Sequence, residues 1–148
     1  GFAEAWVDKV APFMGIRESR VIRGKYILTV DDIVSLKRFE DVVAVAGYPV
    51  DIHHASGGDC TMIYCDDSYD LPYRVLVPET IGGLLVAGRC SSMDHGAMAA
   101  TRVMSTCMAL GQAAGTAARL AIDAGVPVAD VDIKALQEEL LKNDVFLG

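Results

Sequence analysis

A short apolar run followed by a glycine and an arginine is the first feature of this sequence that suggests chemistry. In the segment GGLLVAGRC, residues 84–87 are apolar and are followed by Gly88 and Arg89. An apolar run this short, bounded by glycines, is typical of a strand buried on both faces of an α/β sheet. In such sheets ligands bind beyond the carboxyl ends of the strands. Gly88 would let a ligand approach the backbone, and Arg89 would offer five N–H donors.

A downstream stretch rich in alanine predicts the longest helix of the chain. Its apolar residues recur at helical spacing up to residue 124, with Ser105 or Thr106 as the N-cap and Gly125 as the C′ residue. Gly111 and Gly115 share one face of this helix. Two internal glycines each cost about 1 kcal/mol relative to alanine. We therefore expect a backbone or a ligand to pack very close to this face.

The strand end and the helix N-terminus together predict a site for a negatively charged group. A helix N-terminus carries roughly half a positive charge and free N–H groups. These suit a phosphate, or the negative charge that builds on the pyrimidine ring of a flavin when it is reduced. Gly88 would let a diphosphate or a ribityl chain approach. An ordinary β-α unit without a ligand stays open as the alternative, because such units are common.

The elements expected in the first part of the chain are short. Residues 4–14 predict a helix that ends at Gly15, and residues 20–28 predict a strand. Thr29 and Asp32 resemble a capping box, so a helix is expected over residues 30–39. Residues 41–47 are dense in β-branched side chains and favour a strand, with a helical extension left open.

The second part of the chain alternates irregular and regular segments. Residues 51–70 are polar and predict a long surface loop or a small hairpin, in which His53 and His54 are either solvated or a proton relay. A strand over 71–78, the buried strand over 84–88 and an irregular stretch over 89–105 follow. An amphipathic helix over 132–144 ends the chain.

The four cysteines favour reduced thiols over a metal site. Cys60 and Cys65 are spaced C-x4-C, and three histidines are present, so zinc is conceivable. None of the tight pairs of structural zinc modules occurs, however. Cys107 falls within the expected long helix, where a thiol packs as a small apolar side chain. We therefore predict that the chain binds no metal.

Length and charge narrow the class of protein. The chain has 148 residues, about one domain, and 52% of them are hydrophobic, which is enough for a core. A net charge of −7 without a basic stripe argues against nucleic-acid and anionic-membrane partners. No apolar run approaches the ~20 residues of a membrane helix. A cytoplasmic location is favoured, although a chain that begins without Met leaves a leader on a longer precursor open.

Four segments together resemble the C-terminal part of bacterial FAD-dependent oxidoreductases. They are LLVAGR (84–89), HGA (95–97), Arg102 and MSTCMALGQAAGTAA (104–118). Three upstream segments are also similar to this family, namely RESRVIRGKYILTVDDI (17–33), KRFEDVVAVAGYPVDIHH (37–54) and YDLPYRVLVP (69–78). The resemblance covers nearly the whole chain. The family shares the glutathione-reductase-like FAD fold and is distantly similar to fumarate reductase flavoproteins.

The resemblance implies a fold and a division of the chain. The fold would be α/β, the C-terminal part of a Rossmann-like FAD/NAD(P)-binding fold with attached substrate-side strands. Residues 1–80 would be the substrate-side segment of a larger flavoenzyme. Residues 81–125 would be the last strand and long helix of the FAD-binding fold, and residues 126–148 a C-terminal amphipathic helix.

The resemblance also implies which residues bind the cofactor. Gly88 and Arg89 would lie against the diphosphate and ribityl chain of FAD. Gly111, Gln112 and Ala113 would bring backbone near O2 and N1 of the isoalloxazine ring. Many relatives carry an acidic residue at the position of Arg89, so this chain departs from them there.

Two further residues are implied to be catalytic. His95 and Arg102 would project toward the flavin or the substrate, and Arg102 would clamp a substrate anion, since an arginine fork suits a carboxylate. Ordinary ion pairing of Arg89 and Arg102, and an ordinary loop role for His95, stay open.

The sequence contains no G-x-G-x-x-G motif. In this fold the motif follows the first strand, and an acidic ribose-binding residue comes roughly 20 residues later. We therefore expect a C-terminal piece that carries the flavin-ring end of the site without the adenosine end. The whole enzyme would pass a hydride or electrons to or from an unidentified organic substrate.

A stand-alone, non-catalytic interaction module is the alternative, and a small Rossmann-like nucleotide binder is a weaker one. A chain cut within a fold exposes a sheet edge and an apolar helix face, so self-association is expected.

Overall fold

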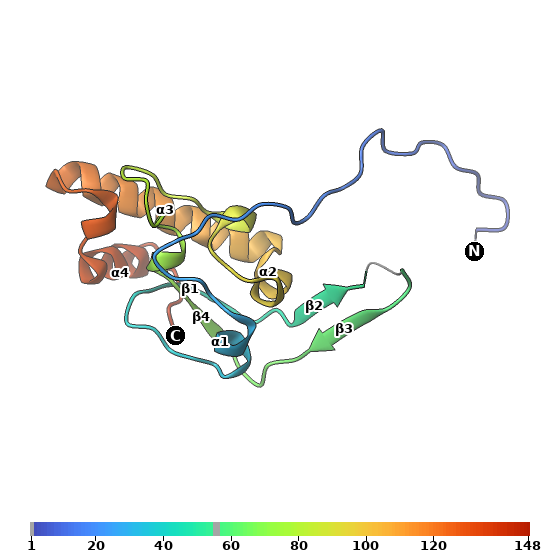
Figure 1. Ribbon diagram of the computed structural model, residues 1–148, viewed down its shortest axis with the longest axis horizontal. Coiled ribbons are helices and arrows are strands. Elements are labelled where there is room, and N and C mark those ends of the chain that lie inside the picture. The colour runs from blue at the N-terminus through green and yellow to red at the C-terminus, as the bar shows by residue number, and fades with distance from the viewer. Residues whose placement is uncertain (1, 55–56) are drawn as a thin grey trace.

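A computed structural model describes residues 2–54 and 57–148. The helices and strands in chain order are α1 (Val30–Val34), β1 (Val42–Ala46), β2 (Val50–His53), β3 (Cys60–Ile63), β4 (Tyr69–Pro72), α2 (His95–Thr101), α3 (Met104–Ala124) and α4 (Ile133–Lys142). Single 3₁₀ turns lie at Tyr73–Val75 (η1), Gly88–Cys90 (η2) and Val128–Asp130 (η3). Helices α3 and α4 lie together at one end of the molecule, and the β2–β3 hairpin projects from the other (Figure 1).

The sheets of the described residues are small and antiparallel. Strand β1 pairs with β4, which places Ala44 opposite Leu71, and β2 pairs with β3, which places Val50 opposite Ile63. The expected mixture of helices and strands is therefore confirmed, as is the strand within residues 41–47. Of the two alternatives for residues 51–70, a long loop or a small hairpin, the structure has the hairpin, which begins at Val50. The parallel sheet of a Rossmann-like fold is not formed by residues 2–54 and 57–148.

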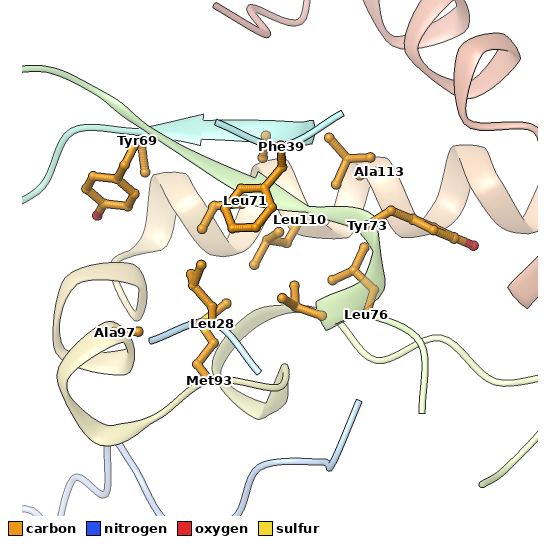
Figure 2. Packing of buried hydrophobic residues seen from close by; sticks show 14 of the residues in the cluster. Leu28, Phe39, Tyr69, Leu71, Tyr73, Leu76, Met93, Ala97, Leu110 and Ala113 are labelled. Carbon is orange, nitrogen blue, oxygen red and sulfur yellow. The ribbon is translucent and has the colours of Figure 1, made fainter. Parts of the chain in front are cut away.

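Helix α3 is the longest element and one wall of the core. Leu110, Ala113, Ala117 and Ala121 are buried along a single face at helical spacing. Figure 2 labels Leu110 and Ala113 of α3 among the buried side chains of the core, which also includes Leu71 of β4. Small alanine side chains let α3 pack against β1 on one side and α4 on another. The helix ends, as predicted, at a left-handed glycine, Gly125, with φ 67°.

Three extended segments meet on the other side of this core. Residues 22–28 run between residues 74–79 and residues 90–94 and exchange backbone hydrogen bonds with both. Gly24 makes the closest approach, because its N–H donates to Ser92 Oγ over 3.0 Å. A Cβ at Gly24 would lie 2.7 Å from the Ser92 Cβ. The continuous strand predicted over residues 20–28 is wrong, since only isolated bridges form at Gly24 and Leu28.

One carboxylate joins two helices just beyond these segments. Asp94 is the N-cap of α2 and accepts a hydrogen bond from the Ala97 N–H at 2.7 Å. Its other oxygen accepts the Val30 N–H at the start of α1, at 3.1 Å. The capping box predicted for Thr29 and Asp32 is confirmed in full. Because α1 and α2 share Asp94, the position of one N-terminus fixes the other.

Several predicted elements are wrong, each for a reason visible in the packing. Residues 4–14 form no helix, since their apolar side chains meet nothing in the described chain; Trp6 is 84% exposed. Residues 84–88 form no strand, because no strand of the described chain pairs with them. Of their N–H groups, only that of Val86 donates to the backbone of a neighbouring segment, at Leu76 O. The strand predicted over 71–78 ends at Pro72 and turns into η1.

Two other helical predictions need correction. The irregular stretch predicted over 89–105 contains α2, and α1 stops at Val34 rather than residue 39 because Leu36 adopts a positive φ of 54°. Helix α4 is confirmed within residues 132–144, with Asp132 as its N-cap. Within residues 2–54 and 57–148, no helix is both long enough and apolar enough to cross a membrane.

Two helical glycines give opposite predictions for one substitution. A Cβ at Gly96 would lie 2.6 Å from the Val30 Cβ, whereas a Cβ at Gly111 meets no described atom within 4 Å beyond the neighbouring backbone of its own helix. We expect Gly96→Ala to lower the free energy of unfolding by about 1–3 kcal/mol through overpacking. Gly111→Ala should raise it by about 0.5–1 kcal/mol through helix propensity. Urea unfolding of both variants measures this; a stabilising Gly96→Ala would contradict the α1–α2 contact.

The Asp32 carboxylate predicts how stability depends on pH. Burial opposes its ionisation, but hydrogen bonds from Lys37, Tyr26 and Thr29 outweigh burial and hold its pKa below the usual value. A carboxyl group with a lower pKa in the folded chain stabilises it above the unfolded pKa, and this stabilisation is lost as the pH falls through the folded pKa. The free energy of unfolding should therefore fall on acidification below about pH 4. Urea unfolding should show a shallower fall in Asp32→Asn; equal falls would contradict the assignment.

Candidate functional site

A hollow of about 470 Å³ lies where the turn η2 meets the start of α3. Its lining residues are Arg89, Arg102, Met104, Cys107 and Met108. The volume is within the usual range for small-molecule sites, about 300–1,000 Å³. Two guanidinium groups line it: Glu18 compensates the charge of Arg102, and Arg89 leaves the hollow with one uncompensated positive charge. The structure thus brings together the predicted site residues Arg89 and Arg102.

The start of α3 adds N–H donors to this hollow. The N-cap position is Val103, whose side chain makes no capping hydrogen bond, so the prediction of Ser105 or Thr106 as the cap is wrong. The first-turn N–H groups therefore have no side-chain acceptor. In a helix of 21 residues, they present the positive end of the helix dipole beside Met104.

Gly88 lies in the turn η2, close to helix α3. Its φ is 80°, a left-handed conformation that residues with a side chain rarely adopt. A Cβ there would lie 3.7 Å from the Cys107 Cβ, so η2 packs directly against α3. Both predicted cofactor-binding residues of this turn, Gly88 and Arg89, therefore lie at the edge of the hollow.

Arg89 carries the uncompensated charge of the site. The only hydrogen bond of its guanidinium within the described chain is a long one, 3.5 Å, to the Ile16 carbonyl, and the guanidinium forms no ion pair there. It also lines a second, smaller hollow of about 130 Å³ beside Ile16–Arg20. A free guanidinium between two hollows suits a phosphate or carboxylate ligand.

His95 and Arg102 meet at Glu18. The Nδ1 atom of His95 lies 2.7 Å from Glu18 Oε1, and Arg102 donates to Glu18 Oε2 over 3.3 Å. Arg102 also donates to the Asp51 carbonyl over 3.0 Å. Glu18 lies 77 residues before His95, and sequence reasoning missed it, since no local spacing connects the two. The only signal was its place in the segment RESR, which shares the family resemblance.

The predicted residues Gly111, Gln112 and Ala113 lie in the interior of α3, three to five residues beyond Met108, and they do not line the hollow. Helical hydrogen bonds engage their N–H groups, so they offer a cofactor their surface and not free donors. Ala113 is buried in the core, whereas Gly111 and Gln112 are exposed. Apart from the neighbouring backbone of α3 itself, no described atom lies within 4 Å of a Cβ at Gly111 or Gly115. The expectation of a tightly packed backbone is therefore wrong for the described chain, and the face is open.

A larger hollow, about 670 Å³, lies elsewhere, between η1 and the start of α4. Its arginines already hold carboxylates: Arg74 donates to both oxygens of Asp41, at 2.9 and 3.1 Å, and Arg38 pairs with Asp70 at 2.7 Å. An arginine held by a carboxylate binds a further anion weakly, because the pair is already neutral. The hollow beside Arg89 is the better candidate site, because it combines a free guanidinium with a helix N-terminus.

The remaining titratable residues do not assemble a metal site in the described part of the chain. His53 and His54 lie on the hairpin, where they contact Asp51 and Thr61 of that same hairpin. The four cysteines are free thiols. Among residues 2–54 and 57–148, no three His, Cys, Asp or Glu side chains are placed to hold a metal ion.

Cys107 predicts a reactivity pattern that tests the hollow. Burial raises the pKa of the Cys107 thiol, an effect that outweighs the nearby charge of Arg89. Cys60 and Cys90 are exposed. We expect iodoacetamide at neutral pH to modify Cys60 and Cys90 well before Cys107, because the thiolate is the reacting form. Peptide mass spectrometry over time measures this. Modification of Cys107 as fast as Cys90 would contradict the described packing of η2 on α3.

The geometry agrees with what the family comparison shows. The family model for FAD dependent oxidoreductases matches residues 1–140 of the 148. No curated protein and no solved structure matches the chain. The residues at the hollow fit such a cofactor, since an uncapped helix start, a free guanidinium and a left-handed glycine suit the electron-rich edge and phosphates of FAD. The chain belongs to the FAD dependent oxidoreductases, and its cofactor is FAD.

Proposed function

We propose that this chain forms the flavin-ring end of the FAD site in a larger oxidoreductase that passes a hydride or an electron pair to or from a small organic substrate. The observation that carries the proposal is the convergence of Gly88, Arg89, Arg102 and the uncapped start of α3 on one hollow. The finer relationship we propose is to bacterial enzymes with the glutathione-reductase-like FAD fold, distantly similar to fumarate reductase flavoproteins.

The cofactor-binding residues have separable roles in this proposal. FAD, when bound, supplies the hydride or electron-pair chemistry, while the protein supplies orientation and charge. Gly88 gives the cofactor access to the backbone of η2, and Arg89 offers a free cation for its phosphates. The start of α3 stabilises negative charge near it. Gly111 and Gln112 mark the open side of α3 along which the cofactor extends, while Ala113 is buried in the core behind them.

His95 and Arg102 are the proposed catalytic residues. They are the first residue and the C-cap of α2, so the two ends of one short helix hold both. Arg102 lines the hollow, and its side chain is only 11% exposed, whereas that of His95 is 66% exposed. Arg102 therefore faces the ligand from a fixed position, and His95 keeps a nitrogen open to an incoming substrate.

The exposed face of α3 supports a larger protein around this chain. Met104 is 83% exposed, Met108 74% and Ile122 80%, and the open Gly111 and Gly115 lie on the same side. An uncovered apolar helix face of this length marks an interface. Two glycines on it cost helix stability, and a surface or ligand packed closely there offsets that cost. We propose that the remainder of a Rossmann-like FAD fold, with the adenosine end of the site, covers this face.

A stand-alone interaction module is the second candidate. The same exposed face of α3, together with Trp6 and Phe13 at 84% and 85% exposure, favours association with another protein or copy. An interaction module would bind its partner without flavin, so the flavin content of the purified protein distinguishes it from the proposed oxidoreductase.

A single substitution on the open helix face tests the proposed function. The complete reading frame that contains this chain, expressed and purified, should carry flavin absorbance. Gly111→Glu should abolish it, because a charged side chain would occupy the surface next to the cofactor. Gly47→Glu is the matched control, since a Cβ there also meets no described atom within 4 Å; it should retain the flavin.

The contrary outcomes are distinct. Flavin retained by Gly111→Glu would show that the assigned face is wrong. A colourless protein that takes up no added FAD, yet assembles as concentration rises, would favour the interaction module.

A further inference from the structure

We propose that Glu18 is a positioning residue of this site, which holds His95 in the tautomer protonated at Nδ1 and so leaves Nε2 free to accept a proton from substrate. The proposal rests on the proposed function for its substrate, but the geometry behind it belongs to this chain alone. It assigns a role to a segment, residues 17–20, that otherwise only precedes the fold.

A chain of contacts fixes the Glu18 carboxylate. The Asp51 carbonyl of β2 accepts a hydrogen bond from Arg102 at 3.0 Å, and Arg102 donates to Glu18 Oε2 at 3.3 Å. The Arg102 side chain is 11% exposed and held from two sides, so it is a stiff support. Glu18 Oε1 then faces His95 Nδ1 at 2.7 Å. Each carboxylate oxygen therefore serves one partner.

The carboxylate decides which ring nitrogen of His95 carries the proton. An ionised carboxylate only accepts hydrogen bonds, so at 2.7 Å His95 Nδ1 must be the donor. In the neutral ring Nε2 then holds the lone pair. No described residue makes a hydrogen bond to Nε2 of His95, and the side chain is 66% exposed. The basic nitrogen is therefore open toward the outside of the molecule.

This arrangement suits proton transfer. When Nε2 takes a proton from a substrate O–H or C–H, the N–H bond forms at His95 and the electron pair of the broken bond stays on the substrate. The imidazolium that results lies 2.7 Å from the Glu18 carboxylate, which stabilises the new charge. Glu18 acts through His95 and does not itself touch the reacting atoms.

A purely structural role explains the contact less well. An ion pair with an exposed histidine contributes little to stability, commonly about 0–1 kcal/mol. Residues 2–17 are exposed, and Glu18 is the first residue of the chain that is partly covered. The segment is tied down just after it, where the Ile22 N–H donates to the Cys90 carbonyl at 2.9 Å. The segment before Ile22 therefore places the Glu18 carboxylate beside His95 and Arg102 and makes few other contacts with the described chain.

The test measures the tautomer of His95 in the chain itself, without flavin. Two-bond ¹H–¹⁵N spectra of the ¹⁵N-histidine-labelled protein, recorded where the imidazoles are neutral, distinguish the two tautomers. The signals of His95 are assigned by their loss in His95→Gln. Wild type should show His95 protonated at Nδ1. His53 is an internal contrast, because its Nε2 faces Asp51 at 3.2 Å.

Glu18→Gln should switch the tautomer. Arg102 can only donate, so the amide turns its oxygen to Arg102 and its NH₂ to His95, which makes Nδ1 an acceptor and moves the proton to Nε2. Glu79→Gln is the matched control. It removes a surface carboxylate paired with Arg23 at 2.7 Å and should leave His95 unchanged.

The outcomes separate this inference from the proposed function. A His95 already protonated at Nε2 in wild type, or unmoved by Glu18→Gln, would overturn the positioning role and leave flavin binding untouched. A flavin-free reading frame with a tautomer that switches would overturn the proposed function, while the control of His95 by Glu18 would stand.

Discussion

The structure depends on one carboxylate, that of Asp94. It caps α2 through the Ala97 N–H and α1 through the Val30 N–H, while its own N–H donates to the Leu28 carbonyl at 2.9 Å. The start of α2 is thereby locked to the segment that leads into α1. Close packing at Gly96 also holds α1 and α2 together, because only a hydrogen atom fits between α2 and Val30. The contacts of Asp94 and Gly96 therefore fix the position of α2, and with it the positions of His95 and Arg102.

The residues of the candidate site lie close in the chain or in space to this contact between α1 and α2. His95 and Arg102 are the two ends of α2, and α3 begins two residues after Arg102. The extended segment before α1 brings Glu18 back to α2, and the turn at Gly88 rests on Cys107 of α3. Charges of both signs meet there, but Glu18 compensates Arg102 and leaves Arg89 free. The result is a hollow with one uncompensated cation beside the positive end of a long helix.

Local patterns predicted the elements whose stabilising contacts are near in sequence. The capping box at Thr29 and Asp32, strand β1, the hairpin, α3 with Gly125, and α4 follow from spacing alone. The wrong predictions needed a distant partner. Residues 84–88 have a strand's composition but no ladder, and residues 4–14 have apolar side chains but nothing in the described chain to cover them. Gly88 and Arg89 were identified from the apolar run that precedes them, and His95 and Arg102 by resemblance, whereas Glu18 required the fold.

The central claim is that a flavin ring binds against the start of α3. A crystal structure of the flavin-loaded protein, produced from the complete reading frame, tests it most directly. The account predicts the isoalloxazine ring within contact distance of the first-turn N–H groups of α3, with Arg89 beside the cofactor. A flavin seated instead in the larger hollow between Tyr73 and Lys134, away from α3, would contradict it.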